Sequence, residues 1–278
     1  MFPIVESKEI AKNVFLQKIR APRIARKRKA GQFLIFRYGE SGERIPLTIV
    51  DSDPVEGTVT IIYQVVGKST AELSMAKVGD SIMDVVGPLG LPTHVENFGT
   101  VVGIGGGIGA APLLPIATAI KKAGNRLLSI VGARTKDLLI LEDEMRKISD
   151  EIVVTTDDGS YAKKGFVTSA LQEIIDSGTK IGLCIAIGPV PMMRAVAEVT
   201  RPHGIKTVVS LNPIMVDATG MCGACRVSVG GKTKFTCVDG PEFDGHQVDF
   251  ELLANRLRMY QTQEKQSMEA YRCQCHGK

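Results

Sequence analysis

The stretch Thr100-Val-Val-Gly-Ile-Gly-Gly-Gly-Ile-Gly-Ala-Ala-Pro112 joins an apolar run to a glycine-rich turn and then to a helical pattern. The apolar run at residues 100–104 predicts a buried strand, and residues 112–123 predict the helix that follows. Glycines in such a turn let backbone N–H groups approach a pyrophosphate, and the N-terminus of the helix adds partial positive charge. The stretch therefore predicts a dinucleotide-binding strand–turn–helix unit. The alternative is a turn that only packs the helix on the sheet.

The turn departs from the G-x-G-x-x-G pattern of dinucleotide-binding folds, because Ile108 stands where the third glycine belongs. The next apolar run ends at Ala133-Arg134-Thr135-Lys136 instead of at an acidic residue. Phosphate binding by backbone N–H groups depends on neither feature. The candidate binding residues of this unit are Gly105, Gly106, Gly107, Gly109, Pro112 and Arg134.

Apolar runs and helical patterns alternate from residue 98 to residue 211. Further strands are predicted at residues 127–132, 151–156, 181–187 and 207–211, and further helices at 139–148, 165–177 and 191–201. This alternation is typical of an α/β fold with a doubly wound parallel sheet. Cys184 lies inside one of the apolar strands and is expected to serve in packing.

Two more loops leave the same edge of the predicted sheet. Asp157-Asp158-Gly159-Ser160 follows one strand, and Gly188-Pro189-Val-Pro-Met192 follows another. Ligands of open α/β sheets bind at the C-terminal ends of the strands. Together with the glycine-rich turn, these loops predict a dinucleotide cleft, with Asp157, Asp158, Gly159, Gly188, Pro189 and Met192 as candidates.

Residues 1–97 predict a β-barrel of short strands, with one short helix near residues 69–76. Arg44-Ile-Pro46-Leu47-Thr48 places a cation and a hydroxyl on one strand. Gly67-Lys68-Ser69-Thr70 offers N–H groups and hydroxyls to phosphates at the start of the helix. A basic run, Arg23-Ile-Ala-Arg26-Lys-Arg-Lys29, is expected to be a solvated loop between strands, with docking of an acidic electron carrier as the alternative.

The spacing D-x4-C-x2-C-x11-C joins Asp217, Cys222, Cys225 and Cys237. Plant-type [2Fe–2S] loops read C-x4-C-x2-C with a fourth cysteine further along, so Asp217 stands at the first ligand position. Zinc is an alternative because Asp and three Cys also fit a tetrahedral site. Three buried structural thiols are the other alternative. A hairpin turning at Gly230-Gly231 separates the last two cysteines.

Composition excludes several classes of protein. The 278 residues carry 34 Lys and Arg against 30 Asp and Glu, a net charge of +4, with 5% aromatics and no Trp. Neither the charge nor the aromatic content indicates a nucleic-acid partner. No apolar run is long enough for a membrane span, and the N-terminus is charged where a signal peptide would be apolar. Clustered cysteines favour a reducing compartment, so we expect a cytoplasmic protein.

The order of these motifs resembles the ferredoxin–NADP reductase superfamily: R-x-P-L-T, then G-K-S-T, then G-G-G-x-G-x-A-P, then D-D-G-S and G-P-x-x-M. The cysteine loop narrows the resemblance to the electron-transfer subunit of dihydroorotate dehydrogenase and its relatives. Asp217 in place of Cys, with Arg256-Leu-Arg-Met-Tyr260 in the tail, is similar to the small subunit of NADH-dependent ferredoxin:NADP oxidoreductase, a bifurcating transhydrogenase. The resemblance covers residues 5–262.

The resemblance implies four segments: an FAD-binding β-barrel (1–97), an NAD(P)-binding α/β domain (98–211), a [2Fe–2S] loop domain (212–250) and a helical tail (251–278). Arg44 would lie near the FAD pyrophosphate and Thr48, the catalytic candidate, near the isoalloxazine. Further FAD contacts would come from Pro46, Leu47, Tyr63, Gln64, Val65, Gly67, Ser69 and Thr70. Asp217, Cys222, Cys225 and Cys237 would hold the cluster.

The resemblance also implies partners. These are a larger flavoprotein subunit with its own FAD and iron–sulfur clusters, and ferredoxin indirectly. NAD(H) is favoured over NADP(H), although Arg134 and Lys136 are suited to a 2′-phosphate. Two other functions stay open: a dihydroorotate dehydrogenase electron-transfer subunit, and a zinc-bearing binding module without redox activity. Cys273, Cys275 and His276 lie in the tail beyond the resemblance, and their role stays open.

Overall fold

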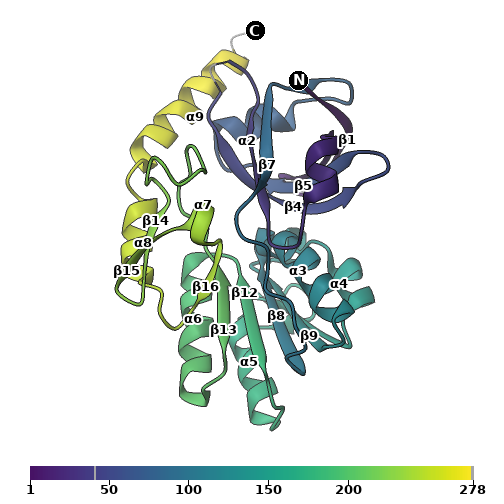
Figure 1. The fold of residues 1–278 in the computed structure, drawn as a ribbon, viewed down its shortest axis with the longest axis vertical. Helices are drawn as coiled ribbons and strands as arrows, with labels where there is room; N and C mark the ends of the chain where they lie inside the picture. Colours follow the sequence, from purple (N-terminus) through teal and green to yellow (C-terminus); the bar gives the residue numbers. More distant parts are fainter. Residues whose placement is uncertain (41, 277–278) are drawn as a thin grey trace.

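The computed structural model describes residues 1–40 and 42–276. Two large sheets stand end to end, the N-terminal one in the upper part of Figure 1 and the second one below it. The C-terminal helices α8 (Phe250–Leu257) and α9 (Gln261–His276) run along the left side from the lower sheet to the upper one. In the described residues, no helix is both long and apolar enough to cross a membrane.

The N-terminal sheet is an antiparallel, nearly closed barrel. In the described part of the chain its seven strands follow the order β6–β1–β2–β5–β4–β3–β7. The outermost strands β6 and β7 are consecutive in the chain and separated only by Met83, so the sheet curls back on itself. The strands are β1 (Phe2–Ala11), β2 (Val14–Arg20), β3 (Phe33–Arg37), β4 (Ile45–Asp53), β5 (Thr58–Gln64), β6 (Ser81–Ile82) and β7 (Asp84–Leu89), with helix α2 at Lys68–Ser74. The predicted barrel is confirmed.

Strand β3 is buried on both faces, and each face has a different neighbour. Leu34 and Phe36 point into the barrel core. Phe33 and Ile35, which alternate with them, pack outside the barrel against the cysteine loop that includes Cys225. Because side chains alternate along a strand, this one short strand links the barrel core to the cysteine loop.

The basic run lies between β2 and β3 and most of its cationic side chains are exposed, as predicted, but the run begins as a helix and not as a loop. Residues Pro22–Lys27 form helix α1, because Pro22 suits the first helical turn and Ile24 and Ala25 are buried against the barrel. Arg28 then donates hydrogen bonds of 2.9 and 2.7 Å to the carbonyl oxygens of Ile49 and Val50. Burial lowers the pKa of this guanidinium. Arg28 is therefore a structural cation that joins α1 to β4.

The second sheet is the predicted doubly wound parallel sheet. Among residues 42–276 its seven strands follow the order β11–β10–β9–β8–β12–β13–β16, and only β16 is antiparallel to its neighbour. The strands are β8 (Thr100–Gly106), β9 (Arg126–Ala133), β10 (Glu151–Thr156), β11 (Lys163–Lys164), β12 (Leu183–Ile187), β13 (Thr207–Ser210) and β16 (Glu242–Asp244), and the helices are α3 (Ala110–Lys122), α4 (Glu142–Ile148), α5 (Val167–Asp176) and α6 (Val190–Thr200). The ends of the predicted strands and helices differ from the observed ends by a few residues.

Helices cover both faces of this sheet, which explains why its strands are apolar throughout. Helices α3 and α4 pack on one face with Val101 and Leu127. Helices α5, α6 and α8 pack on the other with Val102 and Cys184. Helix α3 also packs on Val50 of the barrel, so it joins the two sheets. Cys184 is fully buried, and burial raises its pKa to about 12, which confirms its predicted packing role.

The strand order places a topological switch point between β8 and β12. The chain runs outward from β8 through β9 to β10, then returns to β12 on the other side of β8 and continues to β13. Loops that leave the C-terminal ends of β8 and β12 therefore diverge and open a crevice between them, which is where such sheets bind ligands.

The C-terminal region adds a small hairpin, an edge strand and two helices. Strands β14 (Arg226–Val229) and β15 (Lys232–Phe235) pair around Gly230 and Gly231, both with positive φ, as predicted for a tight hairpin turn. Helix α7 (Thr236–Asp239) carries Cys237, and β16 then joins the second sheet. The domain boundaries themselves stay predictions.

Glu242 of β16 ties the second sheet to the barrel side. Its carboxylate accepts a 2.6 Å hydrogen bond from Thr93 Oγ1, and the Thr93 N–H donates to the carbonyl of Ala30. Burial raises the pKa of the Glu242 carboxyl, and the hydrogen bond from Thr93 offsets part of this rise. The charged carboxylate is therefore less favourable in the folded protein than in the unfolded chain.

We expect the free energy of unfolding to fall as the pH rises through the raised pKa of Glu242, because the folded state holds this proton more tightly than the unfolded state. The stabilisation that comes from this more tightly held proton is fully present below the ordinary glutamate pKa of 4.5 and is lost above the raised pKa of Glu242. In Glu242→Gln the amide still accepts from Thr93 and does not ionise, so this decline should disappear. Urea unfolding of both proteins between about pH 4 and about pH 8 measures the difference. Parallel pH profiles would contradict the expectation.

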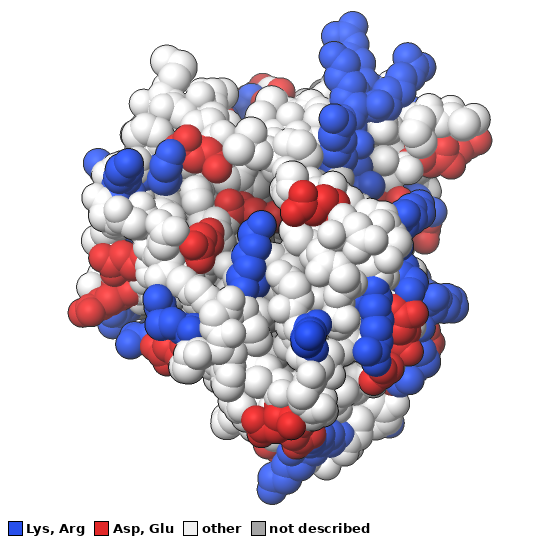
Figure 2. Space-filling model, turned by 60° about the horizontal axis from the view of Figure 1, so that its bottom comes forward, with Lys and Arg blue, Asp and Glu red and all other residues white. Residues whose placement is uncertain are grey.

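Charge is spread over the surface. On the face shown in Figure 2, basic and acidic side chains are interspersed among uncharged ones, apart from one group of basic side chains at the upper right. This distribution fits the modest net charge of +4.

Candidate functional site

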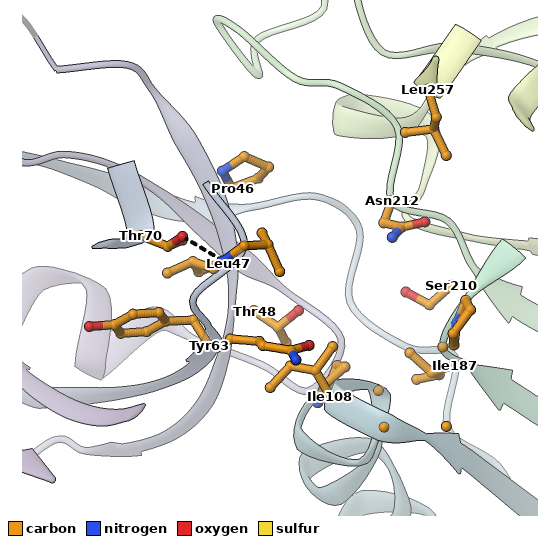
Figure 3. Close-up of a pocket in the computed structure, with 18 of the residues that line it drawn as sticks. Pro46, Leu47, Thr48, Tyr63, Thr70, Ile108, Ile187, Ser210, Asn212 and Leu257 are labelled. Atoms are coloured by element: carbon orange, nitrogen blue, oxygen red, sulfur yellow. Dashed lines mark hydrogen bonds between the residues drawn. The ribbon is translucent and has the colours of Figure 1, made fainter. Parts of the chain in front are cut away.

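A cleft of about 1800 Å³ lies between the barrel and the second sheet. This is roughly twice the upper range of a pocket for one small ligand, so two dinucleotides have room. Figure 3 shows Thr48 and Tyr63 on the barrel side, Ser210 and Ile187 on the opposite side, and Ile108 of the glycine-rich turn between them. The cleft brings together most of the predicted binding residues: Arg44, Pro46, Leu47, Thr48, Tyr63, Gln64, Thr70, Gly106, Gly107, Gly109, Pro112, Arg134, Asp157, Gly188, Pro189 and Met192.

On the barrel side, β4 and β5 build the wall. Thr48 of β4 faces the cleft. Tyr63 of β5 turns its ring away, into the barrel core, where the ring stacks on Phe15 with centroids 6.0 Å apart. Burial raises the pKa of this phenol. Tyr63 therefore meets the cleft through its backbone, and Thr48 supplies a hydroxyl.

The start of helix α2 uses its hydroxyls within the protein. Thr70 Oγ1 accepts hydrogen bonds from the N–H groups of Val66 and Gly67 at 3.1 and 3.2 Å. Ser69 Oγ donates to Glu43 at 3.3 Å. Thr70 lines the cleft, whereas Val65, Gly67 and Ser69 do not. Phosphate binding by Gly67 and Ser69, and contact of the Val65 backbone with the flavin, stay predictions.

The glycines of the turn after β8 serve two purposes. A Cβ on Gly109 would lie 2.2 Å from the carbonyl oxygen of Ile187, and one on Gly105 would lie 2.9 Å from Ala110 Cα. These two glycines allow the turn to pack closely on β12 and on α3. Gly107 has φ +55° and no heavy atom within 4 Å of an added Cβ, and it faces the cleft. Gly105 and Gly109 thus serve close packing, and Gly107 leaves room for a ligand. These findings support both readings of the turn, packing of the helix on the sheet and binding of a dinucleotide.

The loop after β10 contributes one acidic residue to the cleft. Asp157 lines the cleft near Arg134. Asp158 and Gly159 do not line it, and neither does Gly105. The Asp158 carboxylate accepts a 2.9 Å hydrogen bond from the Ser160 N–H, which lowers the pKa of Asp158. Asp158 therefore shapes the turn, while Asp157 and Arg134 are available to a ligand.

The four predicted metal ligands fall into two pairs. The Asp217 carboxylate accepts hydrogen bonds from the N–H groups of Thr219 and Cys222 at 3.0 and 2.9 Å, and these bonds lower the pKa of Asp217. Cys225 and Cys237 are buried, with their sulfur atoms 3.2 Å apart. Burial and the Cys225 thiol raise the pKa of Cys237 to about 12.

This donor set fits a binuclear cluster. A [2Fe–2S] cluster needs two ligand pairs, one on each iron, whereas zinc needs four ligands around one point. Asp217 with Cys222, and Cys225 with Cys237, would supply the two pairs.

Sequence reasoning missed two parts of the cleft wall. Residues 210–216, which begin at the last residue of β13, line the side opposite the barrel, with Ser210 and Asn212 in view in Figure 3. Residues of the tail line another side, among them Leu257 of α8 and Glu264 of α9. Neither segment carries a binding motif. The one available signal was the stretch Arg256-Leu-Arg-Met-Tyr260, quoted above for the family resemblance, because Leu257 and Tyr260 both line the cleft.

Of the tail cysteines, the structure describes the side chain of Cys273. Cys273 is exposed on α9. The side chains of Cys275 and His276 lie outside the described residues, so their role stays open.

Comparison with known proteins supports this geometry. Residues 212–249 match the iron–sulfur cluster binding domain of dihydroorotate dehydrogenase B, a segment that contains all four predicted ligands. Residues 104–198 match the oxidoreductase NAD-binding domain, a segment that contains the glycine-rich turn and the loops after β10 and β12.

Relatives match the chain over nearly its whole length. A Thermotoga maritima protein described as a dihydroorotate dehydrogenase B (NAD(+)) electron transfer subunit homolog is 51% identical, covering 96% of this chain and 94% of its own. The corresponding electron transfer subunit of Fusobacterium nucleatum is 34% identical over 89% of this chain and 97% of its own. A chain of the NADH-dependent reduced ferredoxin–NADP oxidoreductase structure superimposes with a TM-score of 0.92, 50% identity and 98% coverage of both chains. The chain therefore belongs to the family of dihydroorotate dehydrogenase B electron-transfer subunits and their homologues.

Proposed function

We propose that this chain is the electron-transfer subunit of an electron-bifurcating ferredoxin:NAD(P) oxidoreductase. It binds FAD, a [2Fe–2S] cluster and NAD(H), and it works with a larger flavoprotein subunit that carries further FAD and iron–sulfur clusters and meets ferredoxin. The solved relative that is 50% identical over 98% of the chain is an NADH-dependent reduced ferredoxin–NADP oxidoreductase described for flavin-based electron bifurcation, which supports this choice.

One observation carries the proposal: a single layer of side chains separates the cleft from the buried thiol pair. Phe33 and Met215 both line the cleft, and both pack in the same buried cluster as Cys225 and Cys237. A flavin beside Thr48 and a metal cluster on the thiols would then lie on two sides of this layer. Such proximity suits electron transfer between them.

The bound flavin would link two-electron exchange with a nicotinamide to one-electron exchange with the cluster. The chain's task is to hold the ligands in register, because hydride transfer needs positioning more than acid or base catalysis. The turn at Gly107 and the loop at Pro189 would hold the nicotinamide dinucleotide against the face that Thr48 presents. Asp157 offers its carboxylate to ribose hydroxyls, whereas Arg134 of the same cleft is suited to a 2′-phosphate. The choice of NAD(H) therefore rests on the NADH-dependent solved relative.

We also place the protein in the cytoplasm. Cys184, Cys222, Cys225, Cys237 and Cys273 are all free thiols in the described residues. Unpaired thiols are typical of proteins in reducing compartments.

The visible and EPR spectra of the anaerobically purified protein test the function. We expect flavin absorption bands and, after NADH is added, the signal of a reduced [2Fe–2S] cluster, which should appear much faster than with NADPH. NADPH is the matched control because it differs by one phosphate. A colourless protein that contains zinc and no flavin would contradict the proposal.

A second candidate function is the electron-transfer subunit of dihydroorotate dehydrogenase, as the names of two relatives indicate. Both functions use the same cofactors and differ in the partner. The complex purified from its source should reduce NADP⁺ with NADH and reduced ferredoxin. NADH formation from dihydroorotate would favour the second candidate.

A further inference from the structure

Helix α9 closes one side of the cleft. Tyr260, which precedes it, and Gln263, Glu264 and Ser267 all line the cleft. Their spacing of three or four residues places them on one face of the helix. Helix α9 also packs against α2, as the upper left of Figure 1 shows. The tail helix is thus a wall of the cleft and a neighbour of the barrel.

The chemistry of this wall suits a nucleoside and not a phosphate. Glu264 is exposed to the cleft, and its carboxylate has no hydrogen-bond or ion-pair partner among the described residues. Tyr260 is 49% exposed. A carboxylate accepts hydrogen bonds from ribose hydroxyls and from the amino group of adenine, and a tyrosine ring stacks on a base. The same carboxylate would repel a phosphate.

The position of the wall indicates which nucleoside it meets. Thr48 lies beside the glycine-rich turn, whereas Arg44 precedes the start of the same strand. Ser69 of α2 donates a hydrogen bond to Glu43, so the segment at Arg44 is adjacent to α2, and α2 is adjacent to α9. A dinucleotide with its flavin at Thr48 and its phosphates at Arg44 would extend its adenosine toward α9.

We infer that α9 forms the adenosine subsite for FAD, with Glu264 as hydrogen-bond acceptor and Tyr260 as stacking surface. This inference rests on the proposed function, because it requires that the barrel binds FAD. It gives the tail a role in selecting FAD over FMN, which has the same isoalloxazine and one phosphate but no adenosine.

Titration of the flavin-free, full-length protein with FAD and with FMN tests this subsite. In Glu264→Ala the dissociation constant for FAD should rise about tenfold, as expected for the loss of one or two hydrogen bonds, which corresponds to about 1.4 kcal/mol. The dissociation constant for FMN should not change. Glu264→Gln keeps an acceptor oxygen and should recover part of the FAD affinity, and Tyr260→Ala should also weaken FAD binding alone.

Glu269→Ala is the matched control, because Glu269 is an exposed glutamate of the same helix that does not line the cleft. It should change neither dissociation constant. Equal FAD affinity in the wild type, in Glu264→Ala and in Tyr260→Ala would overturn the inference and leave the proposed function standing. An equal loss for FAD and FMN, or a loss of NADH affinity instead, would also overturn it. A wild-type protein that binds no flavin would overturn the proposed function as well.

Discussion

Replacing Cys225 by serine is expected to abolish assembly of the iron–sulfur cluster while FAD remains bound. Cys225 and Cys237 are the buried pair of the four proposed ligands, and a serine hydroxyl is a poor substitute for a thiolate on iron. The purified variant should lose most of its iron and acid-labile sulfide and the EPR signal of the reduced cluster. NADH should still bleach the flavin absorption, because the hydride-transfer side of the cleft is unchanged. Electron delivery to the partner subunit should then fail.

Cys273→Ser is the control for this experiment. Cys273 is an exposed thiol on α9, so its loss should leave iron and sulfide content unchanged. Because the serine at position 225 would sit in the buried cluster with Phe33 and Ile35, circular dichroism and flavin content should be compared with the wild type to show that the barrel remains folded. Full iron and sulfide content in Cys225→Ser would show that Cys225 is not a ligand.

Replacing Gly109 by alanine should destabilise the protein and weaken NADH binding. The added Cβ would lie 2.2 Å from the Ile187 carbonyl oxygen and 2.8 Å from Gly188 Cα, both backbone atoms that have no rotamer to change. The turn after β8 must then move away from β12, which disturbs both glycine-containing loops of the cleft. Overpacking of this kind costs about 3 kcal/mol, and melting temperatures of domains this size fall by about 2–4 °C per kcal/mol.

Gly107→Ala separates steric packing from ligand access in the same turn. The added Cβ at position 107 meets no heavy atom within 4 Å. The only destabilising effect is the left-handed backbone conformation at φ +55°, which costs a residue with a side chain about 1 kcal/mol. We expect a smaller drop in melting temperature than for Gly109→Ala, with weaker NADH binding if the turn contacts the ligand. Equal melting temperatures for the two variants would show that the close approach of Gly109 to β12 has no energetic consequence.

The α/β half of the fold was predictable because its signals are local. Apolar runs of strand length and helical patterns follow one another, and each matches an observed element. The prediction of the barrel half from the sequence was less complete. The sequence of strand β1 carries no clear strand pattern, because Glu6, Lys8 and Glu9 interrupt its apolar residues. Its pairing with β2 and β6 holds it in the barrel. Helix α1 was hidden under a run of basic residues whose buried side, Ile24 and Ala25, is small.

In the candidate site, too, the features with local signals were predictable from the sequence and those fixed by tertiary contacts were not. The glycine turn, the loops after β10 and β12 and the cysteine spacing could each be read from a few consecutive residues, because local backbone geometry and ligand spacing are properties of short segments. The sequence could not assign Phe33 to the layer between the cleft and the thiols. On a strand buried on both faces, nothing in the local pattern tells which face meets which neighbour.

The sequence by itself determined the order of the elements, the ligand-bearing loops and the membership of a redox family, since these depend on residue type and spacing along the chain. Only the tertiary structure decided that residues 210–216 and the face of α9 complete the cleft. It also decided that the cysteine loop rests on the outer face of β3. These contacts join segments separated by up to about two hundred residues, and they are fixed by which apolar faces bury each other when the barrel, the sheet and the tail come together.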